Sequence, residues 1–142
     1  MKKEFLGLMS LLVISACSSS YERYSGVDQN LCDEFLRIAK NEYLSSKECF
    51  RKNIDKYINT GSNSEVVSVV RYECRDDIRK LSYAYLDRAY CSVAEDTYSS
   101  YRSVKSVLMD SSGSMLQAIS SSVDERLLQY VMYYRANHEL PN

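Results

Sequence analysis

The sequence has no tryptophan, one histidine, one proline and four glycines among its 142 residues. The single histidine, His138, has no nucleophile near it in sequence. The sequence also lacks a phosphate-binding P-loop, a nucleophile elbow, a zinc-protease motif and a C-x-x-C pair. We therefore predict a protein that is not an enzyme, with no catalytic residue, no metal and no cofactor. The 18 basic and 19 acidic residues are nearly balanced, so nothing predicts binding to nucleic acid.

The start of the chain has the pattern of an export signal. Lys2 and Lys3 are followed by a short apolar run over 5–14, and the small residues Ser15 and Ala16 then precede Cys17. This run is too short to span a bilayer, and no later apolar stretch is long enough either. The order Leu-Val-Ile-Ser-Ala-Cys over 12–17 resembles the lipobox of bacterial lipoproteins. The resemblance is limited to this N-terminal segment, and it implies that Cys17 is acylated and becomes the mature N-terminus.

The same resemblance suggests a location and a domain plan. Ser18 stands where inner-membrane lipoproteins carry an aspartate, which favours the outer membrane, with the protein anchored by lipid and facing the periplasm. Residues 1–16 are then the signal peptide, 17–27 a lipidated flexible tether, and 28–142 a single helical domain. The segment 18–26 reaches at most ~30 Å, which keeps the domain near the membrane. An ordinary cleaved signal with a coincidental cysteine is the alternative.

The four remaining cysteines are spaced symmetrically. The interval from Cys32 to Cys49 equals that from Cys74 to Cys91, so the pattern is a mirror image about the point between Gly61 and Ser62. In a helix each of these intervals rises about 25 Å, whereas a disulfide needs Cα atoms about 4.4–6.8 Å apart, so neighbours within one helix cannot pair. In an antiparallel hairpin only two nested pairs fit, Cys32 with Cys91 and Cys49 with Cys74. Zinc binding is the rival interpretation, but this spacing is not that of a zinc knuckle, and export favours disulfides.

Apolar residues recur at steps of three and four, which predicts helices. We expect a first helix from the N-cap Asp28 to about 58 and a turn over 59–63 in which Gly61 is the helix C-cap. Ser62 or Ser64 would then cap a second helix over 64–112. That helix is either continuous, with a length of about 60 Å or more, or broken near 97–100. A third helix follows Ser114. The predicted fold is therefore all-α, an antiparallel helical hairpin with two nested disulfides and a third C-terminal helix, forming an elongated three-helix bundle.

The strongest apolar stripe of the first helix lies beside the cysteine seam. Leu36, Tyr43, Phe50 and Tyr57 recur at a heptad spacing, so they share one face. This face packs either on the third helix or on a partner protein, and we list these four residues as candidates for partner binding. All 13 tyrosines lie after the signal, and tyrosine is enriched both at interfaces and over thin bundles.

One short motif suggests a metal site. Asp110, Ser112 and Ser114 form a D-x-S-x-S pattern that resembles the metal-adhesion motif of von Willebrand factor A domains. That family needs a parallel sheet and further ligands well downstream, and neither fits a helical chain whose last residue is Asn142. A turn between two helices is the favoured interpretation.

These features predict a small outer-membrane lipoprotein that binds a protein of the cell envelope through a helical face. Pilotins of secretin-type secretion systems, which are small helical lipoproteins, illustrate this class by architecture, and a chaperone-like role belongs with it. The alternative is an exclusion or inhibitor lipoprotein that blocks a phage, a conjugation apparatus or a muramidase. An envelope enzyme is a third hypothesis.

Overall fold

The computed structural model describes residues 28–140, and every regular element in that range is helical. The chain is therefore all-α over the part described, as the sequence predicted. The α-helices are α1 (Gln29–Tyr57), α2 (Asn63–Glu73), α3 (Arg75–Thr97), α4 (Tyr101–Leu108) and α5 (Ser112–Asn137), with the 3-10 helix η1 (Met109–Ser111) between the last two. The count of three helices was wrong, because the expected second helix is divided.

Polar side chains start the first two helices. The carboxylate of Asp28 accepts a hydrogen bond from the backbone N–H of Leu31 at 3.2 Å, which caps α1. At α2, Ser62 and Glu65 form a reciprocal capping box. Gly61 is not the C-cap, because α1 ends at Tyr57 with Ile58 as its C-cap, and Gly61 has no positive φ. A Cβ at Gly61 would lie 2.6 Å from the Glu65 carboxylate, so a larger residue there would push this carboxylate out of its capping position.

The expected second helix is interrupted twice. At Cys74 the backbone leaves the α-helical region (φ −99°, ψ 16°), although its N–H still bonds to the carbonyl of Val70. This kink separates α2 from α3, and no glycine or proline marks it. The second break follows Thr97, where Tyr98 takes a left-handed conformation (φ 54°) and Ser100 caps α4. The break near 97–100, which the sequence left open, is therefore present.

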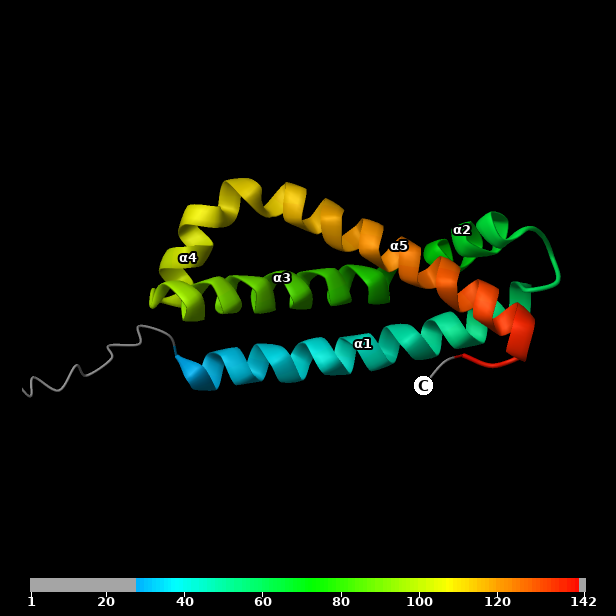
Figure 1. Cartoon of the computed structure of the whole chain (residues 1–142), viewed down its shortest axis with the longest axis horizontal. Coiled ribbons are helices and arrows are strands. Elements are labelled where there is room, and N and C mark those ends of the chain that lie inside the picture. The colour runs from blue at the N-terminus through cyan, green and yellow to red at the C-terminus, as the bar shows by residue number, and fades with distance from the viewer. Residues whose placement is uncertain (1–27, 141–142) are drawn as a thin grey trace, which may run out of the picture.

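Figure 1 shows how the helices are arranged. Helices α1 and α3 lie side by side and antiparallel, and α5 runs obliquely over them in the direction of α1. Helix α2 lies beside the C-terminal part of α5, while α4 is at the opposite end, near the start of α1. No helix within residues 28–140 is long and apolar enough to cross a bilayer.

Two disulfides join α1 to α3 and to the kink that precedes α3. Cys32 pairs with Cys91 and Cys49 with Cys74, with Cα–Cα distances of 5.7 and 5.9 Å. These are the pairs that the cysteine spacing predicted. The first links the start of α1 to the end of α3, and the second links the later part of α1 to the kink between α2 and α3. Both cross-links therefore hold α1 at a fixed register along α3.

The apolar core has two parts. The larger cluster lies where α5 crosses the other helices and contains Phe50, Ile54, Val66, Val70, Cys74, Ile78, Leu81, Val123, Leu127, Tyr130 and Val131. The smaller cluster lies at the α4 end and contains Cys32, Leu86, Tyr90, Cys91, Ala94 and Val104. Each disulfide contributes sulfur atoms to one cluster. The molecule is therefore elongated, with one core near each end.

Candidate functional site

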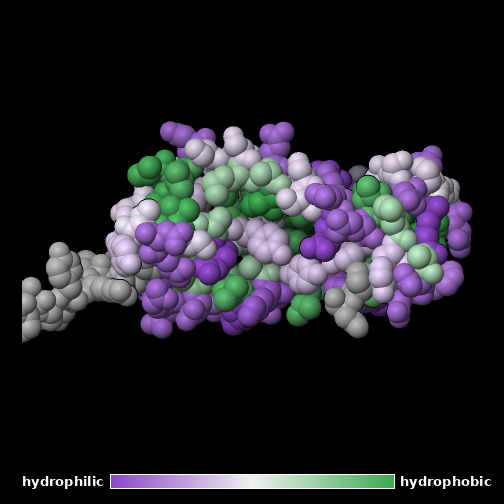
Figure 2. All heavy atoms as spheres, viewed as in Figure 1, coloured by the Kyte–Doolittle hydropathy of each residue, from purple (hydrophilic) through white to green (hydrophobic). Residues whose placement is uncertain are grey.

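A groove of about 420 Å³ lies between α1, α3 and α5. It forms because α5 crosses the other two helices at an angle and does not cover them along their whole length. In Figure 2 the surface is hollowed near the middle of the molecule, with apolar and weakly polar side chains around the opening. The groove is lined by Tyr43, Phe50, Leu81, Tyr85, Ala118, Ile119, Ser122, Val123, Arg126 and Tyr130.

Three tyrosines shape the walls of this groove. The hydroxyls of Tyr43 and Tyr130 are 2.7 Å apart and form a hydrogen bond between α1 and α5. The rings of Phe50 and Tyr130 also pack together, with 6.4 Å between their centroids. Tyr85 on α3 remains 37% exposed, so part of its ring faces solvent. The groove therefore offers a mostly apolar surface, and the hydroxyls of Tyr43 and Tyr130 already satisfy each other.

In the part of the chain that the structure describes, Arg126 is the only charged residue that lines the groove. Its guanidinium donates a 3.4 Å hydrogen bond to the side-chain oxygen of Gln129, its neighbour on α5. None of the ion pairs found within residues 28–140 includes Arg126. A positive charge at the edge of an apolar groove is therefore left without a carboxylate from the described chain, and this makes the groove our candidate binding site.

The structure separates the four stripe residues that the sequence proposed for partner binding. Phe50 is 4% exposed and lies in the larger core, so it lines the floor of the groove with only a small part of its surface. Tyr43 lines the groove, and Tyr57 packs at the edge of the same core. Leu36 is 37% exposed. Helix α5 covers Phe50 and part of Tyr43, so the third helix, and not a partner, buries the middle of the stripe.

Neither Arg126 nor Tyr85 was among the candidate binding residues predicted from the sequence. Arg126 and Tyr85 were missed because the groove exists only through the oblique crossing of α5, which no periodicity encodes. A signal for Arg126 was present, since it lies between Val123 and Tyr130 at helical spacing, beside the apolar face of α5. Cys17 lies outside the described residues, so its lipidation stays a prediction.

A second groove of about 310 Å³ lies between the α2–α3 arm and α5, and Arg71, Arg75 and Arg79 line it. These arginines already have partners. Arg71 pairs with Asp124 of α5, and Arg79 pairs with Asp76 at 3.1 Å. Arg75 stacks over the ring of Tyr72 at 4.6 Å. This groove therefore carries less uncompensated charge than its three arginines suggest.

The D-x-S-x-S segment and His138 lie at opposite ends of α5 in the structure. Asp110 belongs to η1, while Ser112 and Ser114 already lie in the first turn of α5, where the hydroxyl of Ser112 donates to the carbonyl of Met109 at 2.7 Å. The expected turn through Ser114 is therefore shorter than predicted, and the D-x-S-x-S segment spans η1 and the start of α5. No group of three or more histidine, cysteine, aspartate or glutamate side chains that could hold a metal was found in the described part of the chain. His138 is exposed at the C-terminal end of α5.

The hydrogen-bonded pair Tyr43 and Tyr130 is expected to make the stability of the protein depend on pH in the alkaline range. Burial, and then the hydrogen bond with Tyr43, raise the pKa of Tyr130 above its ordinary value. An unfolded tyrosine ionises near pH 10, so above that pH the folded state holds a proton that the unfolded state has lost. We therefore expect the free energy of unfolding to fall above about pH 10, by up to ~1.4 kcal/mol per pH unit from this residue. Urea denaturation at a series of pH values measures the slope.

The matched control for this prediction is Tyr130→Phe, which has no ionisable hydroxyl. Its free energy of unfolding should fall less steeply above about pH 10 than that of the wild type. Burial also raises the pKa of Tyr85 and Tyr101, so some dependence remains in the variant. Equal slopes for the two proteins would show that Tyr130 does not contribute.

Comparison with family models, with curated proteins and with solved structures found no match to this chain. The function proposed below is therefore inferred from this chain's own residues and from the groove.

Proposed function

We propose that this chain is a lipoprotein of the bacterial outer membrane that faces the periplasm and binds a protein of the cell envelope. Its role is that of an assembly module, similar to a pilotin or a chaperone. The groove between α1, α3 and α5 is the binding face. The observation that carries the proposal is Arg126, a cation without an ion-pair partner among residues 28–140, set at the edge of an apolar groove.

Two further features support this proposal. The lipobox-like residues 12–17 would place a lipid on Cys17, a short distance along the chain before the folded domain begins at Asp28. More than one acyl chain anchors a protein stably, whereas a single chain binds only marginally. The two disulfides also fit an exported, oxidising compartment. A groove held close to the membrane by a short tether suits a protein that receives partners at that surface.

The disulfides have a part in this proposal. We propose that they are nested cross-links of one helical hairpin. Helix α1 is one arm of this hairpin, and the kinked α2–α3 segment is the other. The inner pair, Cys49–Cys74, closes the turn, and the outer pair, Cys32–Cys91, holds the open end. Non-reducing peptide mapping of the exported protein should recover these two linkages. Recovery of Cys32 joined to Cys49 would contradict the hairpin.

The membrane anchor is tested by Cys17→Ser. Wild-type protein labelled with palmitate in cells should carry the label and fractionate with the outer membrane. The variant should lose the label, because serine lacks the thiol that is acylated. A wild-type protein without palmitate would contradict the anchor and leave the folded domain unaffected.

The binding face is tested by site-specific photocrosslinking in cells. Ser122 and Ser121 are adjacent, exposed serines on α5, but only Ser122 lines the groove. A benzoyl-phenylalanine at position 122 should give a discrete protein adduct, and the same probe at position 121 should give much less. Equal amounts of adduct at both positions, or no adduct at position 122, would contradict the proposal that the groove is the binding face.

A further inference from the structure

We propose that the groove binds an amphipathic helix that carries a carboxylate placed against Arg126. This inference rests on the proposed function and adds the chemistry of the partner. It specifies the secondary structure of the bound segment, the side chains that enter the groove and the sign of the charge beside them.

The backbone of the groove walls offers no strand pairing to an extended peptide. The walls are α1, α3 and α5, whose N–H and C=O groups are bonded along each helix. No strand edge exists within residues 28–140 to pair with an incoming chain. A bound β-strand would therefore leave its buried backbone groups without partners, whereas a helix satisfies its own. The walls thus favour a helical segment over a strand.

The shape of the apolar surface favours a rod. Leu36 lies two helical turns before Tyr43 on α1, about 10 Å away along the helix on the same face. Leu36 is 37% exposed and Tyr43 lines the groove, so the apolar surface continues along α1 beyond the groove itself. A helix with apolar residues at i, i+3, i+4 and i+7 could cover both. Such a helix would lie between α1 and α5, with α3 beneath it, and complete a four-helix arrangement.

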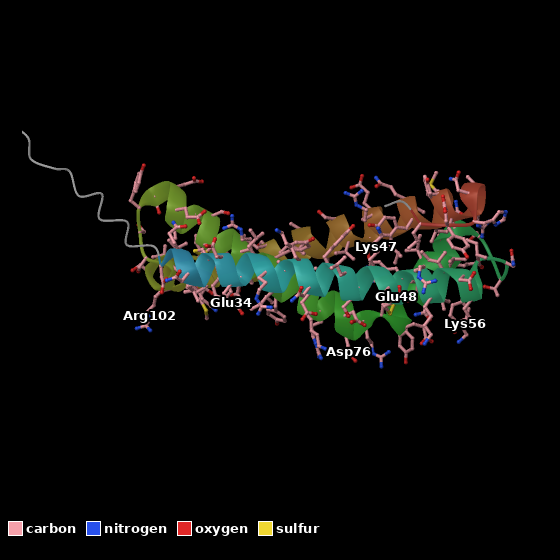
Figure 3. All side chains as sticks on the ribbon, turned by 90° about the horizontal axis from the view of Figure 1, so that it is seen from below. Glu34, Lys47, Glu48, Lys56, Asp76 and Arg102 are labelled. Atoms are coloured by element: carbon pink, nitrogen blue, oxygen red, sulfur yellow. A yellow bond between two sulfur atoms is a disulfide. The ribbon has the colours of Figure 1, made fainter. Side chains whose placement is uncertain are left out.

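The charge at the opening selects an acidic partner. No aspartate or glutamate of the described chain lines the groove, and Arg126 lies on its α5 wall. On the α1 side, Lys47 follows Tyr43 by one helical turn and also belongs to none of the ion pairs found in residues 28–140. Figure 3 shows Lys47 on the side of α1 that faces α5. A carboxylate on the bound helix would form a partly desolvated, charge-assisted hydrogen bond with Arg126.

The experiment selects peptides without assuming their sequence. A displayed library of peptides about five helical turns long, with varied apolar and charged positions, is panned on the full-length lipoprotein in detergent micelles. We expect the enriched peptides to have apolar residues at helical spacing and a glutamate or aspartate beside the apolar face that these residues form. Enrichment of alternating, strand-like sequences or of basic sequences would overturn the proposal, and so would a library that yields no binders.

A charge exchange then tests Arg126 directly. For one selected peptide, replacing its acidic residue by the neutral amide should weaken binding to the wild type by about fivefold, the upper range for a surface ion pair. Arg126→Glu should reverse the preference and bind a lysine version of the peptide more tightly than the acidic one. Arg102→Glu, at an exposed arginine of α4 outside the groove, should bind as the wild type does. An unchanged preference in Arg126→Glu would contradict the proposal.

Two further measurements keep the outcomes distinct. Urea denaturation of Arg126→Glu verifies that the variant is folded, and Arg126→Gln repeats the comparison without a reversed charge. A fluorescent fatty acid is offered as competitor, and saturable displacement of the peptide by it would assign the groove to a lipid and overturn the inference. If position 122 crosslinks a protein but the selected peptides are not helical and acidic, the inference fails and the proposed function stands. If no adduct forms at position 122, the proposed function fails first.

Discussion

Replacing Cys32 and Cys91 by serine is expected to lower the free energy of unfolding by about 4 kcal/mol. The two cysteines have a sequence separation of 59. Loss of their disulfide frees the parts of this loop that lie outside the retained Cys49–Cys74 cross-link, which raises the entropy of the unfolded state. The pair also belongs to the smaller core, which has only six buried residues. This cluster has fewer buried residues than the larger one, so we expect the start of α1 and the end of α3 to separate first. Urea denaturation of both proteins under oxidising conditions measures the difference.

The control for this prediction is the other disulfide. Cys49 and Cys74 have a sequence separation of only 25, so the double serine variant should lose slightly less, about 3.5 kcal/mol. This disulfide lies in the larger core, which also contains side chains of α2 and α5. Hydrogen exchange should therefore show local opening at the α4 end in the Cys32/Cys91 variant only. Uniform loss of protection along the whole molecule would show that the two cores unfold as one unit.

The cysteine spacing predicted the disulfide pairs because the rise of a helix is fixed. With about 1.5 Å per residue, only one pairing of four cysteines satisfies two antiparallel helices. The kink at Cys74 could not be predicted in the same way, since its sequence has neither proline nor glycine and its apolar periodicity continues across it. The break at Tyr98 was only one of two alternatives, because a left-handed tyrosine has no distinct sequence signal.

The groove was beyond sequence analysis for a different reason. Periodicity shows which face of each helix is apolar, but not the angle at which two helices cross. The stripe through Tyr43 and Phe50 was therefore found, while its division between core and surface was not. Arg126 was similarly visible only as one charge on the third helix. Its importance comes from the lack of a carboxylate around it in the described chain, which depends on where three helices meet.

The largest effect in the stripe is expected at Phe50. Phe50→Ala should lower the free energy of unfolding by about 3–5 kcal/mol, because a buried phenylalanine leaves a cavity when it is truncated. Its ring packs in the larger core with Tyr130 of α5, so the variant should also loosen the contact between α1 and α5. Loss of partner binding in this variant would therefore follow from a damaged groove and would not identify Phe50 as a contact residue.

Leu36→Ala is the matched control on the same stripe. Leu36 lies two heptads before Phe50 on the same face of α1 but is 37% exposed, and a change there should alter stability by no more than about 0.5 kcal/mol. If the bound helix extends along α1 as proposed, Leu36→Ala should weaken peptide binding and leave the urea midpoint unchanged. Phe50→Ala should change both. A loss of stability in Leu36→Ala as large as that in Phe50→Ala would mean that this end of α1 is already covered in the protein, and the surface for a partner would then be limited to the groove.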